Sequence, residues 1–103
     1  MELKEMQKRI YQNKVNHGFN TTNVYFEFCL LEGEISEAFE AYHKKHDNLG
    51  EELADSAIYL FGLAEILGID LQTEIEKKMK INEERVYVKV NGANVKKGSK
   101  DDI

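Results

Sequence analysis

Apolar residues recur at intervals of three and four along one stretch of the chain, and this spacing constrains the fold more than any other feature. It places the apolar side chains on one side of an α-helix, whereas a half-buried β-strand would alternate apolar and polar residues. The chain contains no proline, the residue that most strongly breaks a helix. We therefore predict one long helix whose buried stripe consists of Val24, Phe28, Leu31, Ile35, Ala38, Phe39 and Tyr42.

Other segments show the same helical spacing, and turn signals separate them. Gly18 and Gly68 suit the left-handed position that follows a helix C-terminus. Only a short turn, at residues 47–50, separates the second segment from the third, so these two helices should be antiparallel neighbours. The predicted helices cover residues 3–15, a stretch capped by Thr21 or Thr22 that ends near His43, residues 51–67 and residues 71–85. We predict an all-α fold, a helical bundle of about four helices with two long antiparallel central helices.

The last part of the chain has a different pattern, because residues 87–96 alternate apolar and polar side chains around Asn91 and Gly92. An Asn-Gly pair in such a setting indicates a β-hairpin, but a two-stranded hairpin by itself is only marginally stable in water. We predict that residues 1–87 form one helical domain. Residues 88–103 are predicted to be a tail, either a short hairpin or irregular, that ends in disorder.

The net charge of −5 argues against several kinds of partner. A nucleic-acid-binding module would normally be basic, and a membrane span would need a run of about 20 apolar residues. The sequence shows neither feature, and residues 1–10 lack the apolar stretch of a signal peptide. We expect a cytoplasmic protein that binds neither nucleic acid nor membranes.

A chain of 103 residues builds only a modest core, and several of its apolar residues lie off the predicted buried stripes. Exposed apolar surface usually marks a partner surface, so we expect a homo-oligomer in which a second copy completes the core. The single cysteine, Cys29, lies within an apolar run and is predicted to be a buried free thiol. The apolar residues off the stripes are Tyr25, Phe26, Cys29, Leu30, Ile58 and Ile66.

Two acidic pairs mark the second and third predicted helices. Glu34 and Glu37 lie three residues apart and therefore share one helix face, and Glu52 and Asp55 repeat this spacing on the neighbouring helix. Carboxylates that face one another near a core repel, and a divalent cation would relieve that repulsion. Oxygen ligands without cysteine or paired histidine favour Mg²⁺, with Mn²⁺ as a substitute, over zinc. Solvated acids without a ligand are the alternative, because acidic residues are common in this chain.

Glu40 and His43 offer a competing metal pattern. Their spacing is half of the carboxylate and histidine motif of di-iron bundles, and two chains could supply two copies. His43, however, lies at the polar end of its predicted helix beside Lys44, where cationic groups suit the helix C-terminus. We therefore favour a solvated histidine at this position.

The acidic pairs form a Glu-x-x-Glu motif and, after an interval of fourteen residues, a Glu-x-x-Asp motif. Two further blocks follow in order, Leu67-Gly68-Ile69-Asp70 before the last predicted helix and Lys78-x-x-x-Asn82-x-x-Arg85 at its end. Together these blocks resemble the MazG-like nucleoside triphosphate pyrophosphohydrolases. The resemblance covers about residues 19–87. It departs from the family pattern at Gly33, where many relatives carry an additional acid.

The resemblance implies an all-α enzyme that uses Mg²⁺ to cleave a nucleoside triphosphate to the monophosphate and pyrophosphate, with a role in cleaning the nucleotide pool. It also implies a homodimer or a dimer of dimers. Gly33 leaves open the number of metal ions and the identity of the general base. The implied roles are metal binding by Glu34, Glu37, Glu52 and Asp55, base catalysis by Glu37 or Glu34, and substrate binding by Lys78, Asn82 and Arg85.

A non-catalytic helical dimer that binds a nucleotide or a partner protein is the alternative function. Turnover separates the two functions, because a binder would show saturable nucleotide binding without release of pyrophosphate. A purely structural bundle with solvated acids is a third interpretation, and its stability would not depend on Mg²⁺.

Overall fold

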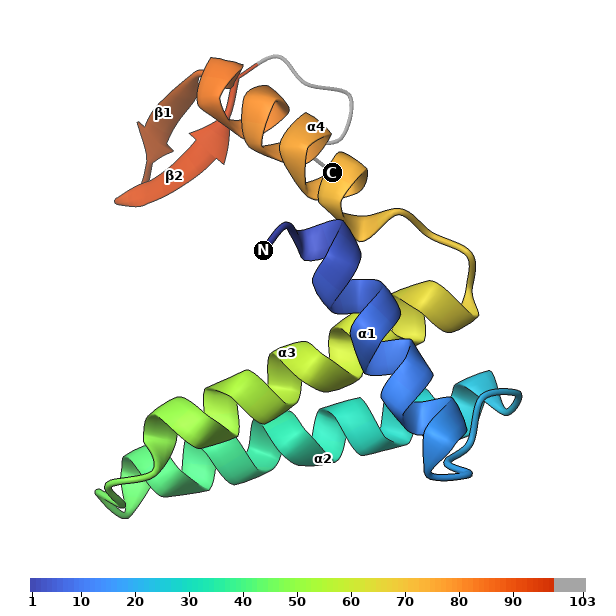
Figure 1. Ribbon diagram of the computed structural model, residues 1–103. Coiled ribbons are helices and arrows are strands. Elements are labelled where there is room, and N and C mark those ends of the chain that lie inside the picture. The colour runs from blue at the N-terminus through green and yellow to red at the C-terminus, as the bar shows by residue number, and fades with distance from the viewer. Residues whose placement is uncertain (98–103) are drawn as a thin grey trace. The chain divides into compact units, whose positions relative to one another are not determined.

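The computed structural model describes residues 1–97, which form four helices followed by a two-stranded hairpin (Figure 1). The all-α fold class is therefore confirmed. The chain divides into two compact units, Met1–Gln72 and Thr73–Ile103. The elements are α1 (Leu3–Asn16), α2 (Val24–His43), α3 (Leu49–Ile66), α4 (Leu71–Glu84), β1 (Tyr87–Val90) and β2 (Ala93–Lys96).

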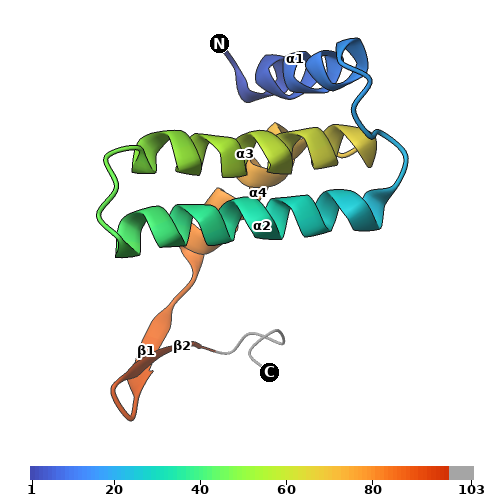
Figure 2. The same ribbon diagram turned by 90° about the horizontal axis from the view of Figure 1, so that it is seen from below.

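In the first unit, α3 lies between α1 and α2, and α2 and α3 run antiparallel (Figure 2). The two long antiparallel helices are therefore as predicted. No helix within residues 1–97 has both the length and the apolar composition that crossing a membrane requires.

Local hydrogen bonds set where the helices begin and end. Asn23, rather than Thr21 or Thr22, caps α2, because its side chain accepts from the backbone N–H of Phe26 at 3.0 Å. Gly18 follows α1 with a φ of +69°, as predicted for a residue past a helix end. After α2 the left-handed position is taken by Lys45, and α3 starts at Leu49. The turn is therefore earlier than predicted, and Gly50 lies inside α3.

The face that α2 turns toward the core differs from the predicted stripe. Glu27, Ala38 and Ala41 are buried, and Leu31 and Glu34 are half-buried. The large side chains of the predicted stripe, Phe28, Ile35, Phe39 and Tyr42, are exposed. Small and acidic residues thus face inward, whereas the aromatic residues face outward. The predicted burial is wrong within the single chain for these four large residues, whereas Ala38 is buried as predicted.

Cys29 is exposed in the single chain, so the predicted buried thiol is also wrong here. Its neighbours Tyr25 and Phe26 are exposed as well, and Tyr25 retains 87% of its accessible surface.

The second unit contains a hairpin, one of the two alternatives that the sequence left open for the tail. β1 and β2 pair antiparallel, with Val88 opposite Val95. Asn91 and Gly92 both have positive φ, at 52° and 82°, as the two central residues of a type I′ turn require. The predicted disorder at the C-terminal end lies in part at residues 98–103, outside the described residues.

Candidate metal centre

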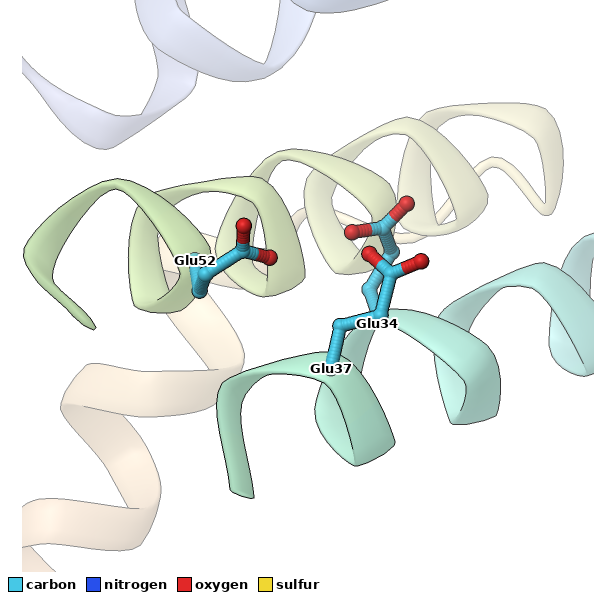
Figure 3. Close-up of side chains that lie close together, drawn as sticks. All are labelled: Glu34, Glu37 and Glu52. Atoms are coloured by element: carbon cyan, nitrogen blue, oxygen red, sulfur yellow. The ribbon is translucent and has the colours of Figure 1, made fainter. Parts of the chain in front are cut away.

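Three carboxylates from two helices converge between α2 and α3. Glu34 and Glu37 lie on α2, and Glu52 lies one turn into α3 (Figure 3). One carboxylate oxygen from each lies within 4.8 Å of the others. We call these three residues the acidic cluster. Within residues 1–97, these are the acidic, histidine or cysteine side chains that lie close enough together to hold a metal ion. His43 is not part of this group.

Two oxygens of the acidic cluster lack a partner within the part of the chain that the structure describes. Among the described residues, Glu34 Oε2 and Glu52 Oε2 are buried and accept no hydrogen bond. A buried carboxylate oxygen without a partner is costly, and a bound divalent cation would satisfy it. The donor set is made of hard oxygens, which fits Mg²⁺ or Mn²⁺. The sequence-predicted metal site therefore has the chemistry that such an ion needs.

Asn48, the residue before α3, supports Glu52. Its side-chain Nδ2 donates to Glu52 Oε1 at 3.2 Å, which leaves the other oxygen of that carboxylate available. Asn48 Oδ1 is itself buried without a partner among the described residues. The amide thus orients one ligand of the candidate site, as residues behind metal ligands commonly do.

The surroundings of Glu34 favour its protonated form. Burial raises the pKa of this carboxyl, as do the charge of Glu37 and the hydrogen bond between the two groups; the charges of Asp55 and Glu52 act in the same direction. A cation bound at the cluster would oppose each of these electrostatic effects. The site therefore destabilises the ionised form of Glu34 when no counter-charge is bound.

This pKa shift predicts how stability depends on pH without metal. A carboxyl whose pKa is raised in the folded state binds a proton more tightly there, so stability falls as pH rises from about 4.5 through the raised value. The glutamine amide in the Glu34→Gln protein does not ionise, so this position no longer contributes to the pH dependence of stability. We expect the melting temperatures of wild type and Glu34→Gln in EDTA to be close near pH 4.5, with the variant increasingly more stable toward pH 7.5. A constant difference across that range would contradict the assignment.

Asp55, the fourth predicted ligand, lies beside the acidic cluster rather than within it. It is exposed on α3, three residues after Glu52, and is not among the three residues whose oxygens lie within 4.8 Å. Its charge nevertheless contributes to the raised pKa of Glu34. Asp55 is therefore within electrostatic range of the cluster, and its role as a ligand stays a prediction.

Glu27 is a buried acid on the same face of α2, and both of its carboxylate oxygens have partners within the protein. Its side chain is 1% exposed, and Lys14 Nζ lies 2.5 Å from its Oε1 while Asn20 Nδ2 donates to its Oε2 at 3.0 Å. Glu27 and Glu34 are seven residues apart, so they share one side of α2. Sequence reasoning missed Glu27, although this spacing from Glu34 could have indicated it.

Sequence reasoning also missed Tyr59, a residue of α3 whose phenol is affected by the charges of both Glu27 and Glu34. Burial raises the pKa of its phenol, as do the negative charges of Glu34, Glu27 and other acids of the site. The hydroxyl therefore stays protonated at neutral pH and can act as a hydrogen-bond donor. Tyr59 follows Asp55 by four residues on α3, which is the spacing of one helix face.

The predicted substrate-binding residues belong to the second unit. Lys78 and Asn82 are exposed and lie four residues apart on α4, and Arg85 is half-buried just after its end. The backbone N–H of Arg85 donates to the carbonyl oxygen of Asn82 at 3.3 Å. Lys78 and Asn82 thus share the spacing of one helix face, Arg85 lies beyond the helix, and contact of the three with a substrate stays a prediction.

Comparison with known proteins places the chain in a family. Residues 29–101, well over half of the sequence, match the MazG-like family. The chain therefore belongs to the MazG-like family, as the order of its motifs predicted. This membership supports a nucleotide pyrophosphohydrolase-type function in general, and the family is generally metal-dependent. No curated protein and no solved structure gives a significant match.

Proposed function

We propose that this protein is a cytoplasmic, Mg²⁺-dependent nucleoside triphosphate pyrophosphohydrolase that converts an NTP or dNTP to the monophosphate and pyrophosphate. Its role would be to clean the nucleotide pool. One observation carries the proposal: a MazG-like chain brings three carboxylates within 4.8 Å of one another and leaves two of their buried oxygens without a partner among residues 1–97. Solvated surface acids would have no reason to be buried in this way.

The acidic cluster and Asp55 would hold the metal, with Mg²⁺ as the expected ion and Mn²⁺ as a substitute. A bound divalent cation would neutralise phosphate charge and lower the pKa of a bound water. Glu34 and Glu52 offer buried oxygens and are the better-fixed ligands. The net charge of −5 makes a cation between protein and triphosphate all the more necessary.

Glu37 is the better placed of the two candidate bases. It is exposed, whereas Glu34 is half-buried, so Glu37 can exchange a proton with solvent water. In the proposed reaction the water oxygen bonds to the α-phosphorus and its proton passes to the carboxylate. The bond between the α-phosphorus and the bridging oxygen breaks, and pyrophosphate leaves with that oxygen.

An open groove in the first unit could receive the nucleoside. It lies between α1 and α3, has a volume of about 810 Å³, and is within the size range of small-molecule sites. Ala57 and Phe61 provide apolar lining, and Gln12 and Asn13 provide amides. Tyr59 lines this groove, and burial and the charges of the acidic cluster raise the pKa of its hydroxyl. Substrate binding by Lys78, Asn82 and Arg85 stays part of the proposal.

We propose in addition that the protein is a homodimer or a dimer of dimers. The outward-facing aromatic residues of α2 would otherwise leave a large apolar surface in water, with Phe39 and Tyr42 each 68% exposed. Exposed residues of α3, such as Leu53 and Ile58, add to that surface. Sedimentation equilibrium at micromolar concentration should show a dimer or tetramer, and a stable monomer would contradict this part of the proposal.

Hydrolysis in ¹⁸O-labelled water tests where the water attacks. Attack at the α-phosphorus places the label in the nucleoside monophosphate and leaves the pyrophosphate unlabelled. Label in the pyrophosphate would mean attack at the β-phosphorus and would overturn the proposed reaction. The non-catalytic alternative predicts that neither product forms, although one nucleotide would bind saturably.

A further inference from the structure

Lys14 connects all three helices of the first unit. It begins on α1 and its stem crosses α3 at Gly62, where an added Cβ would lie 3.2 Å from Lys14 Cδ. Its Nζ lies 5.7 Å from the centre of the Tyr59 ring on α3 and reaches Glu27 on α2. Gly62 therefore leaves the space through which a cation on α1 reaches an acid on α2.

The contacts at Glu27 are those of a built internal site. The Lys14 side chain is 11% exposed and that of Glu27 is 1% exposed. Asn20, in the loop between α1 and α2, occupies the second oxygen of Glu27, and its own Oδ1 accepts from the backbone N–H of Asn23. We call Lys14, Asn20 and Glu27 the Lys14 bridge. All three precede the residues that match the MazG-like family.

The Lys14 bridge and the acidic cluster act on the same side of α2. Glu27 lies two helical turns before Glu34, about 10 Å along the axis, and a continuous helix joins them. Glu34 must meet Glu52 across the gap between α2 and α3, so the position of α2 along α3 decides whether their oxygens can share one ion. Buried ion pairs with satisfied hydrogen bonds are strongly directional, which suits them to fix such a position.

We propose that the Lys14 bridge is a positioning device that holds α2 against α3 so that Glu34 and Glu52 can bind one metal ion. Its residues lie outside the acidic cluster, and because Lys14 also lines the groove proposed for the nucleoside, metal affinity is measured without nucleotide. The inference rests on the proposed metal site, and it adds that metal affinity depends on a lysine of α1 that is not a ligand. Loss of a residue that hydrogen-bonds a metal ligand typically weakens metal binding by about 10- to 100-fold, and we expect a loss at the low end of that range for residues that act through the helix.

Mn²⁺ titration followed by electron paramagnetic resonance tests this without any turnover. Lys14→Met keeps the length of the side chain and removes its charge, and we expect its Mn²⁺ Kd to rise by about tenfold or more. Lys14→Arg, which can still pair with Glu27, should recover most of the affinity. Lys44→Met is the matched control, because Lys44 also pairs with a glutamate, Glu40, at 2.5 Å, but on the exposed surface. It should bind Mn²⁺ like wild type.

Gly62→Ala provides an independent variant in case Lys14→Met fails to fold. Its added Cβ would press on the Lys14 stem, whereas Gly50→Ala on the same helix meets nothing within 4 Å. We expect Gly62→Ala to weaken Mn²⁺ binding and Gly50→Ala to leave it unchanged, at a temperature where circular dichroism shows both folded. Wild-type Mn²⁺ affinity in folded Lys14→Met or Gly62→Ala would overturn the inference alone. Absence of Mn²⁺ binding to wild type would overturn the proposed metal site, and the inference with it.

Discussion

We expect the Glu37→Gln protein to hydrolyse its nucleotide about 10²- to 10⁴-fold more slowly than wild type, which is the usual contribution of a general base. Glutamine keeps the shape of the side chain and its hydrogen-bonding capacity, but it cannot accept the proton of the attacking water. Glu37 lies in the acidic cluster and is its exposed member. The measurement is pyrophosphate release at saturating nucleotide, with Mg²⁺ titrated for each protein.

Glu40→Gln is the matched control for this experiment. Glu40 lies one turn further along α2, is exposed and pairs with Lys44 instead of facing the acidic cluster. Its replacement should leave turnover within about twofold of wild type, since exposed ion pairs contribute little. A Glu37→Gln protein that works at the wild-type rate would show that the catalytic centre lies elsewhere.

The second large effect concerns stabilisation by metal. An ion that binds only the folded protein adds about 2.7 kcal/mol of stability at a concentration 100 times its Kd. For a domain of this size that corresponds to a rise in melting temperature of roughly 10 °C or more. Glu52→Gln removes a ligand with a buried, unpartnered oxygen, so it should abolish most of the Mg²⁺-dependent rise. Differential scanning calorimetry with Mg²⁺ and with EDTA measures this directly.

Glu51→Gln is the control, because Glu51 is an exposed neighbour on the same first turn of α3. It should keep the full Mg²⁺-dependent rise. Without metal, Glu52→Gln should be at least as stable as wild type, because it removes one of the charges that repel Glu34. Asp55→Asn in the same series shows whether the fourth predicted acid is a ligand. An equal rise in wild type and Glu52→Gln would rule out the proposed site.

The helices and the acidic cluster could be predicted because each depends on local spacing. Three-residue spacing places Glu34 and Glu37 on one face of any helix, and a short turn brings Glu52 opposite them on the next. The turn of the hairpin could also be located, because Asn91 and Gly92 accept the positive φ that it requires, although the sequence left open whether the strands pair. These features need no knowledge of how distant parts of the chain pack.

The buried face of α2 could not be predicted in this way. Periodicity shows that a helix has an apolar side, but it does not show what covers that side. Here Ala38 and Ala41 pack inward with Glu27, while Phe39 and Tyr42 face outward. Buried acids such as Glu27 escape prediction for a related reason, since their partners come from elsewhere in the chain. Lys14 is thirteen residues away and on another helix.

Release of pyrophosphate by the purified wild-type protein is the most direct test of the central claim. The substrates should be a panel of canonical and modified NTPs and dNTPs, each assayed with Mg²⁺ and with EDTA. We predict that at least one nucleotide yields equal amounts of monophosphate and pyrophosphate with Mg²⁺ and neither product with EDTA. If no nucleotide is cleaved while one binds tightly, the protein is the non-catalytic binder and the proposed enzyme is contradicted.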